Sequence, residues 1–408
     1  MLSVEAARAK VIEVMGPCAE NLPTETIDIA AAPGKSLGRI LAENLIADRN
    51  YPPFNRSIRD GYAVRAADVT GPGAKLRLVG ESRAGVGYSE TLGAGECVRI
   101  LTGAPVPRGS NAVMMQETAR AEGDAVIFDQ AARPEQYFVH AGAEARIGET
   151  IMTRGAKFSY AELAVAAEVG RTKLLVYRRP RVAILASGDE LVDAAAEPSR
   201  FQIRNSNSIA IAAQVALAGG EAVMLGIAPD RIAELTALIK KGLECDVLVL
   251  SGGVSIGTYD LVEAALQELG ATFFFDAVAI RPGKPAVFGW CHDKPVFGLP
   301  GNPVSTMVTF ELFARPAIEM LNGFKPQALP FFKAKLKHPV TEKGAVAHFL
   351  PARVSWPGDE PEVEVMLWEG SGDIGAVVRG NCFVRVRETK LHLEAGEWVD
   401  ILPRRATF

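Results

Sequence analysis

The sequence lacks the long apolar runs that mark membrane proteins. No segment approaches the roughly 20 consecutive apolar residues that a transmembrane helix needs. The N-terminal stretch MLSVEAARAKVIEVM has scattered charges and no continuous apolar core, so we do not expect a signal peptide. We therefore expect no membrane partner and a cytoplasmic protein.

Cysteine and histidine are scarce, with five residues of each in the chain. The cysteines lie far apart in sequence, and no Cys-x-x-Cys pair is present. Such spacing argues against a disulfide framework and against a zinc site, and it is typical of a reducing compartment.

An excess of one charge is also missing. The chain carries 44 basic and 48 acidic residues, and its net charge of -4 predicts no nucleic-acid partner. Hydrophobic residues make up 48% and charged residues 23%, as in ordinary folded proteins. A length of 408 residues accommodates about two to four domains.

The residue pattern of the chain changes near residue 50. The first forty-odd residues predict a helix, a turn at residues 32–35 and a second helical piece through Leu45. Residues 51–150 contain short apolar runs between glycines and prolines, which predicts an all-β module. Residues 159–169, SYAELAVAAEV, predict a short helix with Ser159 as its N-cap and Gly170 at its end.

From residue 180 to about 323, strand and helix patterns alternate. Strands are predicted at 181–186, 222–227, 246–250, 272–280 and 295–299, with helices at 206–218, near 232–239, up to Gly270, and after Asn302 and Pro303. This alternation predicts a parallel α/β sheet covered by helices on both faces. Residues 328–408 return to short strands and predict a small β-domain.

Four unusual loops follow predicted strands of this sheet. They span residues 187–190, 251–257, 281–284 and 299–302. Each loop alone is typical of a simple turn. Because the carboxyl ends of parallel strands meet at one edge, where ligands bind open α/β sheets, the four together predict a ligand site.

The loop SGGVSIGTYD, residues 251–260, has the glycine spacing of a P-loop but carries Thr258 where a P-loop has lysine. Its backbone N–H groups and the following helix suit a phosphate or another oxyanion. Arg281 and Lys284 would add positive charge to the same site. The loop therefore predicts an anion site that differs from a nucleoside triphosphate site.

Several candidate residues also have a structural interpretation. Asn302 is expected to be an N-cap, worth about 1 kcal/mol. Asp260 fits a capping box with Glu263, and it could instead hold a divalent cation, as could the acidic pair Asp189 and Glu190. Further candidates with two interpretations are Asp230, as a helix cap or a site residue, and Asp60, as a buried turn residue or a site residue.

A set of motifs in fixed order resembles the molybdopterin molybdenumtransferases, the MoeA-type family that shares its fold with the C-terminal domain of gephyrin. The resemblance extends from near residue 1 to about residue 320. The motifs are SIRDGYAV, LTGAPVP followed by NAVMMQE, SGDEL, QIRNSNS, SGGVSIGTYD, RPGKPAVFG and FGLPGNPVS.

The resemblance implies an elongated homodimer with four domains in each subunit. These are a helical domain I (1–47 and 147–178), a β-rich domain II (48–146), an α/β molybdopterin-binding domain III (179–327) and a C-terminal β-barrel-like domain IV (328–408). The active cleft is expected between domain III of one subunit and domain II of the other.

The resemblance also implies a reaction. Adenylylated molybdopterin and molybdate are the substrates, the phosphoanhydride is cleaved, AMP is released and molybdenum remains on the dithiolene. Mg²⁺ or another divalent cation is required. Molybdopterin adenylyltransferase and apo-molybdoenzymes are candidate partners.

Site residues carry over from the family's motifs position by position. The amides of Gly252 and Gly253 would bind a phosphate, while carboxylates hold the cation. The implied catalytic residues are Asp60, Thr102, Glu190, Asp230, Asp260, Arg281 and Lys284, with Glu190 and Asp260 on the metal. The implied cofactor-binding residues are Ser251, Gly252, Gly253, Ser255, Pro300, Gly301, Asn302, Arg353 and Ser371.

Some positions depart from the family pattern. Arg59 replaces a usual methionine, Glu144 an aspartate and Thr258 an acidic residue; Arg281 is more often lysine, and residues 370–375 follow the pattern loosely. These departures keep open a non-catalytic molybdopterin-binding scaffold. A weaker alternative is adenylyl transfer onto molybdopterin, which uses a similar α/β domain.

Overall fold

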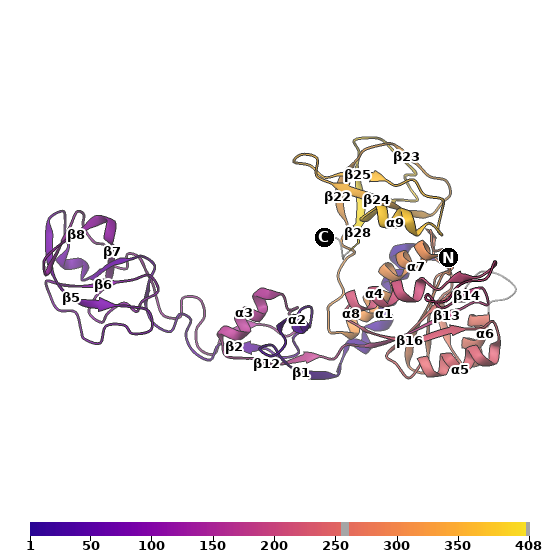
Figure 1. Ribbon diagram of the computed structural model, residues 1–408, viewed down its shortest axis with the longest axis horizontal. Helices are drawn as coiled ribbons and strands as arrows, with labels where there is room; N and C mark the ends of the chain where they lie inside the picture. The colour runs from indigo at the N-terminus through magenta and orange to yellow at the C-terminus, as the bar shows by residue number, and fades with distance from the viewer. Residues whose placement is uncertain (254–260, 405–408) are drawn as a thin grey trace. The chain divides into compact units, whose positions relative to one another are not determined.

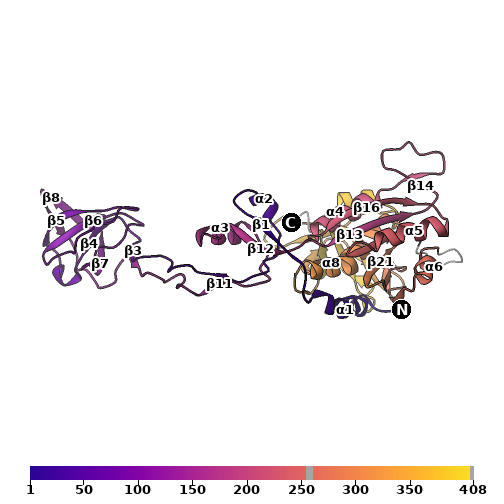
Figure 2. The ribbon, with the colours of Figure 1, turned by 90° about the horizontal axis from the view of Figure 1, so that it is seen from below.

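The structure, a computed structural model, describes residues 1–253 and 261–404, and the chain forms two compact units (Figures 1 and 2). The first unit contains Met1–Ile27, Gly38–Ala42 and Leu175–Phe408. The second contains Asp28–Leu37 and Glu43–Leu174. Each unit thus combines segments that are far apart in sequence, and the division into four domains stays a prediction.

A six-stranded sheet in the order β16-β13-β17-β21-β20-β18 forms the centre of the first unit. Its strands β16 (Glu221–Ala228), β13 (Arg181–Ser187), β17 (Val247–Ser251) and β21 (Lys294–Leu299) are parallel, as predicted. The remaining two strands, β20 (Val287–Cys291) and β18 (Thr272–Phe275), are antiparallel, so the prediction of a wholly parallel sheet is wrong at this edge.

The reversal at this edge includes a tight turn. Cys291 pairs with Lys294, which leaves His292 and Asp293 as a two-residue turn, and both have positive φ, 45° and 60°. Such a turn connects antiparallel neighbours in a tight hairpin. The pair His-Asp is a weaker sequence signal for this turn than Asn-Gly, and the hairpin was therefore not predicted.

Helices cover both faces of the sheet. One face packs against α1 (Val4–Met15), α4 (Asn207–Leu217), α7 (Pro303–Thr309), the π-helical segment η4 (Phe310–Ala314) and α8 (Arg315–Leu321); α5 (Ile232–Gly242) and α6 (Leu261–Glu268) pack against the other. Along β13, Val182 and Ile184 belong to the first core and Ala183 and Leu185 to the second. The period of two places successive side chains on opposite faces.

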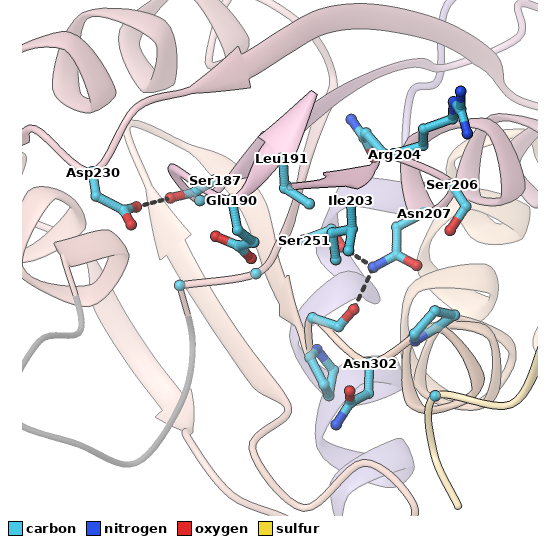
Figure 3. A pocket seen from close by; sticks show the side chains of 18 of the residues that line it. Ser187, Glu190, Leu191, Ile203, Arg204, Ser206, Asn207, Asp230, Ser251 and Asn302 are labelled. Carbon is cyan, nitrogen blue, oxygen red and sulfur yellow. Dashed lines mark hydrogen bonds between the residues drawn. The ribbon is translucent and has the colours of Figure 1, made fainter. Parts of the chain in front are cut away.

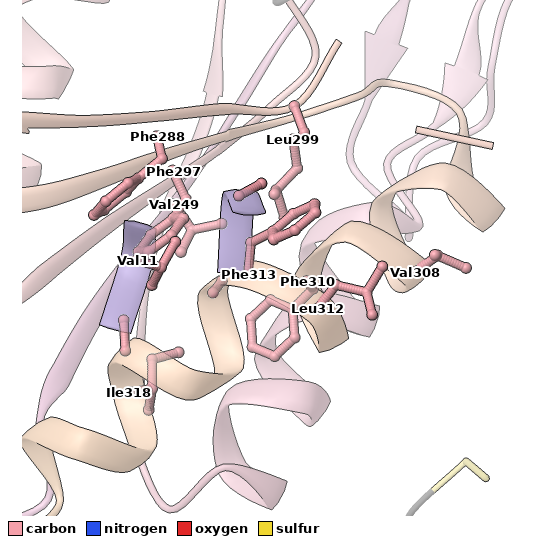
Figure 4. Packing of buried hydrophobic residues seen from close by; sticks show 14 of the residues in the cluster. Val11, Val249, Phe288, Phe297, Leu299, Val308, Phe310, Leu312, Phe313 and Ile318 are labelled. Carbon is pink, nitrogen blue, oxygen red and sulfur yellow. The ribbon is translucent and has the colours of Figure 1, made fainter. Parts of the chain in front are cut away.

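Several phenylalanine side chains contribute to the larger core. Phe288 and Phe297 stack with their ring centroids 4.8 Å apart, and Val11 of α1 packs into the same cluster (Figure 4). Burying a side chain of this size stabilises the fold by roughly 1.5–3 kcal/mol. The first helix of the chain is therefore an integral part of the α/β unit.

The start of the chain corrects one prediction. After α1 and the turn η1 (Pro17–Ala19) comes a strand, β1 (Thr24–Asp28), and α2 is a single turn (Pro33–Ser36). Gly38 has φ of 74°, a conformation that ends helices, and Leu41 forms a β-bridge with Val176. The predicted second helix through Leu45 is therefore wrong.

The C-terminal part of the first unit is a closed five-stranded barrel, which confirms the predicted small β-domain. Its strands are β24 (Ala347–Ser355), β25 (Glu362–Val365), β22 (Phe332–Leu336), β28 (Trp398–Pro403) and β26 (Cys382–Val386), and β26 closes the barrel by pairing with β24. One helix, α9 (Ile374–Arg379), precedes β26. The short strand β19 (Ile280–Arg281) joins β24 in parallel, and so connects the barrel with the α/β part.

The second unit contains a six-stranded β-sheet, the single-turn helix α2 and one longer helix. The sheet has the order β7-β4-β6-β5-β9-β8, with β4 at Gly61–Val64, β5 at Ala74–Ser82, β6 at Glu96–Ile100, β7 at Ala112–Met115, β8 at Ala119–Glu122 and β9 at Ala125–Phe128. The helix α3 (Tyr160–Glu168) begins after Ser159, whose side chain forms a capping box with Glu162. Both the β-module and this helix were predicted, and Gly170 follows with φ of 71°.

Short strand pairs complete the described residues. They are β1 with β12 (Lys173–Tyr177), β2 (Leu45–Ile46) with β11 (Thr150–Met152), β3 (Arg56–Ser57) with β10 (Phe138–Val139), β14 (Leu191–Val192) with β15 (Ile203–Arg204), and β23 (Val340–Thr341) with β27 (His392–Leu393).

Candidate functional site

A pocket of about 600 Å³ lies at the carboxyl ends of β13, β17 and β21 (Figure 3). Three of the four predicted loops contribute several lining residues; the fourth, 281–284, contributes none, although Pro285, the residue after it, lines the pocket. Because these strands are parallel, their carboxyl ends lie at the same edge of the sheet, where ligands bind in open α/β folds. Eight of the site residues predicted from the sequence line this pocket: Glu190, Asp230, Ser251, Gly252, Gly253, Pro300, Gly301 and Asn302.

Glycines allow two of these loops to approach each other closely. Gly252 has φ of 87°, and a Cβ atom there would lie 2.5 Å from the Ser187 carbonyl oxygen. A Cβ atom at Gly301 would lie 3.7 Å from the Cα atom of Gly252. The strand ends thus pack backbone against backbone, and a side chain at Gly252 would push them apart.

The main-chain amides of the glycine loop are not equivalent. The Gly252 N–H donates to the Leu299 carbonyl at 3.2 Å, so this amide is engaged within the protein. Gly253 has φ of 65° and lines the pocket. Of the two amides predicted to bind a phosphate, only that of Gly253 is left for the role in this conformation. Ser255 and Asp260 lie outside the described residues, as does Thr258.

Acidic side chains form one wall of the pocket. The Asp230 carboxylate accepts a hydrogen bond from the Ser187 hydroxyl at 3.1 Å, and the Asp230 N–H donates to the Asp189 carboxylate at 3.1 Å. The interpretation of Asp230 as the cap of the next helix is wrong, because α5 has Arg231 as its N-cap. Asp230 instead connects the loop after β16 with the loop after β13.

Glu190 lines the pocket with an exposed side chain whose carboxylate folds back over Gly188. A carboxylate is the donor type that Mg²⁺ prefers. Within residues 1–253 and 261–404, no cluster of three or more acidic, histidine or cysteine side chains could hold a metal ion. Its proposed companion, Asp260, is not among these residues, so the metal site stays a prediction.

The turn Arg281-Pro-Gly-Lys284 reaches the pocket through Pro285. Arg281 and Lys284 are exposed, and neither belongs to the lining. The first residue of the turn is fixed by strand pairing, because Arg281 pairs with His348 of the barrel strand β24. The basic pair is therefore close in sequence to the pocket wall, while its charged groups extend into solvent.

The barrel contributes one segment to the pocket. Gly372 is a lining residue, and its neighbour Ser371 accepts a hydrogen bond from Val304 through its backbone carbonyl. Arg353 is exposed on β24 opposite Glu364 and does not line the pocket. Of the two predicted residues of the last domain, Ser371 lies beside the pocket in the structure and Arg353 does not.

The second unit brings Asp60 and Thr102 together. The Asp60 carboxylate oxygen accepts the Thr102 N–H at 2.6 Å and the Thr102 hydroxyl at 2.7 Å. These two hydrogen bonds hold the pKa of Asp60 below its usual value, and the bond from the Thr102 backbone has the larger effect. Asp60 is exposed, so the interpretation as a buried turn residue is wrong.

One departure from the family pattern, Glu144, has a local partner. The Glu144 carboxylate accepts from the Arg56 guanidinium at 2.6 Å, and Arg59 is exposed next to Asp60. The Arg56–Glu144 pair therefore gives the replacing glutamate a contact within the β-module.

Several residues that line the pocket were not among the sequence candidates, and Asn207 is one of them. Asn207, the first residue of α4, donates hydrogen bonds to Ser251 and Gly301 (Figure 3). The motif QIRNSNS contains it, but three polar residues before a helix are usually capping residues. Only the packing of α4 against two strand ends distinguishes Asn207 from its neighbours.

Family models match the chain from end to end. They are "MoeA N-terminal region (domain I and II)" at residues 2–170, "Probable molybdopterin binding domain" at 183–320 and "MoeA C-terminal region (domain IV)" at 333–403. No helix in the described ranges has the length and apolarity to cross a membrane.

Curated relatives and solved structures agree with these matches. A molybdopterin molybdenumtransferase of Haemophilus influenzae is 32% identical to this chain, and the match covers 99% of this chain and 98% of the relative. A molybdopterin molybdenumtransferase of a Nostoc species is 37% identical, and the match covers 77% of this chain and 73% of the relative. Two structures of molybdopterin biosynthesis MoeA proteins from Pyrococcus horikoshii superpose with TM-scores of 0.79 and 0.80. Their identities are 31% and 25%, and each covers at least 98% of both chains. The chain belongs to the MoeA family of molybdopterin molybdenumtransferases.

Proposed function

We propose that this protein inserts molybdenum into adenylylated molybdopterin and releases AMP, as a step of molybdenum cofactor biosynthesis. The observation that carries the proposal is the 600 Å³ pocket at the strand ends of a domain that matches the molybdopterin-binding family model. Hydrogen-bond donors and carboxylates converge there, as a phosphorylated pterin and a cation require.

The described residues support distinct roles in this reaction. The Gly253 amide and the Ser251 hydroxyl lie where a phosphate group of the substrate would bind. Arg281 and Lys284 would stabilise negative charge on the cleaved phosphoanhydride, provided that their exposed side chains turn toward the pocket on substrate binding. Asp60, with its lowered pKa, is a carboxylate at neutral pH.

We propose Mg²⁺ as the cation, with Glu190 and Asp260 as its protein ligands. When bound, the ion would offset the charge of the diphosphate. Oxygen atoms of the substrate would complete its coordination, because Mg²⁺ sites commonly combine one or two carboxylates with phosphate oxygens.

We also propose that the protein acts as a homodimer in the cytoplasm, with molybdopterin adenylyltransferase as supplier and apo-molybdoenzymes as recipients. All five cysteines are free thiols, which fits a reducing compartment. Sedimentation should give about twice the 43.5 kDa of the single chain. A monomeric mass at micromolar concentration would contradict the dimer.

The reaction is tested by incubating the protein with adenylylated molybdopterin, molybdate and magnesium. We expect AMP release above a no-protein control, and loss of that release in Asp260→Ala. Tight molybdopterin binding without AMP release would identify a scaffold instead. Consumption of ATP with molybdopterin would identify an adenylyltransferase.

A further inference from the structure

Asn207 joins two neighbouring loops of the pocket through one amide group. Its Nδ2 atom donates to the Ser251 hydroxyl at 2.9 Å and to the Gly301 carbonyl oxygen at 2.7 Å (Figure 3). Ser251 ends β17, and Gly301 follows β21, the next strand of the sheet. Asn207 itself belongs to a third element, α4. One side chain therefore connects three elements at the edge of the sheet.

The chemistry of the two acceptors determines the orientation of the amide. The Gly301 carbonyl can only accept, so the atom that faces it must be the nitrogen of Asn207. The Ser251 hydroxyl accepts from the same nitrogen, and its own hydrogen is then free to donate elsewhere. Since Ser251 lines the pocket, an anionic ligand is a suitable acceptor for that hydrogen.

The separation of the two loops is sensitive to small shifts. Gly252 and Gly301 already pack backbone against backbone, and the Gly252 N–H donates to the Leu299 carbonyl. Among the described residues of this loop, the Gly253 amide is the backbone donor left for a phosphate. A displacement of either loop would move this amide and the Ser251 hydroxyl relative to each other, and a displacement of about 1 Å can cost on the order of a hundredfold in rate.

We propose that Asn207 is a positioning residue for the phosphate-binding part of this pocket. It holds the loop 251–253 and the loop 300–302 at the separation at which the Ser251 hydroxyl and the Gly253 amide bind the same phosphate group of the pterin substrate. This inference rests on the proposed function, because that function supplies the phosphate.

Helix α4 provides a closely matched control. Gln214, on the same helix, also donates two hydrogen bonds from its amide nitrogen, to the Met307 carbonyl at 3.1 Å and to the Glu311 carboxylate at 2.8 Å. In both residues the amide oxygen is buried without a partner among the described residues. Gln214 does not line the pocket at the strand ends. Gln214→Ala therefore removes the same kind of contact without touching the two loops.

The experiment compares Asn207→Ala, Asn207→Asp and Gln214→Ala with the wild type. Molybdopterin affinity, KM and kcat for adenylylated molybdopterin, and thermal stability are measured on the full chain. We expect both alanine variants to lower the melting temperature by similar amounts, while only Asn207→Ala raises the Kd for molybdopterin, by about tenfold for lost hydrogen bonds. Asn207→Asp keeps the size but loses the donor, so its Kd should rise at least as much.

A double-mutant cycle tests the connection to Ser251. In a Ser251→Ala background, Asn207→Ala should raise the Kd less than it does in the wild type, because the two residues act on the same phosphate contact. Equal Kd values for wild type and Asn207→Ala would overturn the positioning role alone. An equal loss of molybdopterin affinity in Gln214→Ala and Asn207→Ala would do the same. Wild-type binding without AMP release would overturn the proposed reaction alone, and absence of wild-type binding would overturn both.

Discussion

The backbone carbonyl of Ser371 accepts a hydrogen bond from the N–H of Val304 at 3.0 Å. Val304 is the second residue of α7, and the N-cap residue Asn302 makes no side-chain capping hydrogen bond. A loop of the C-terminal barrel therefore satisfies a helix N–H that Asn302, from its position in the sequence, was expected to cap. Because Gly372 of the same loop lines the pocket, the barrel and the pocket are directly connected.

Straining this loop should weaken the site. Gly370 has φ of 101°, so Gly370→Ala should cost about 1–3 kcal/mol and displace the Ser371 carbonyl. We expect AMP release to fall by about tenfold through misplacement of the pocket wall. Gly344→Ala is the control, because Gly344 has φ of 99°, lies in the same barrel and likewise has open space around it. Equal activity losses in the two variants would contradict the connection.

The close approach at Gly252 predicts a larger loss of stability. In Gly252→Ala the new methyl group would meet the Ser187 carbonyl oxygen at 2.5 Å, in addition to the strain of a φ of 87°. We expect a loss of more than about 3 kcal/mol in the free energy of unfolding, seen as a lower melting temperature. Gly270 has φ of 77° and no atom within 4 Å of an added Cβ, so Gly270→Ala should lose stability only through backbone strain. Similar melting temperatures for both variants would disprove this account.

The two hydrogen bonds from Thr102 predict a pH effect. Thr102→Ala removes the hydroxyl donor but keeps the N–H, so the pKa of Asp60 should rise toward its usual value. If Asp60 acts as a carboxylate, the acid limb of the pH–rate profile for AMP release should shift to higher pH. Thr102→Ser keeps a hydroxyl and should restore the wild-type limb. An unchanged acid limb in Thr102→Ala would show that Asp60 does not control it.

Buried His348 predicts acid destabilisation. Its side chain is 1% exposed, burial and the charge of Arg281 lower its pKa, and Glu342 at 3.0 Å opposes that shift. Above the unfolded pKa of about 6.5 the residue is neutral in both states. As pH falls below that value, the unfolded chain takes up the proton first, and stability should fall by up to about 1.4 kcal/mol per pH unit until the folded pKa is passed.

The measurement is the melting temperature between pH 7.5 and 5 for wild type and His348→Gln. The glutamine variant should lose part of the acid slope, because it has no proton to gain. His338→Gln, which changes a side chain 65% exposed in the same barrel, should keep the wild-type slope. Identical slopes in all three proteins would assign the acid sensitivity to other groups.

Local patterns in the sequence determined much of this protein. The alternation from residue 180 predicts the four parallel strands and their helices, because a period of two and a period of 3.6 are properties of neighbouring residues. The capping box at Ser159 and Glu162 is equally local. The ordered motifs also predicted the family, and the loops at the strand ends predicted where the pocket lies.

The tertiary structure decided what depends on residues far apart in the chain. The hairpin at His292 and Asp293 makes the edge of the sheet antiparallel. Its turn residues are a weak sequence signal, and the hairpin is stabilised by pairing along the whole of β20 and β21. Ser371, 69 positions from Asn302 in sequence (371 minus 302), took the capping role expected of Asn302. Asn207 contacts Ser251 and Gly301 only because α4 begins at the edge where β17 and β21 end. Such contacts follow from chain closure and packing, which a local pattern does not encode.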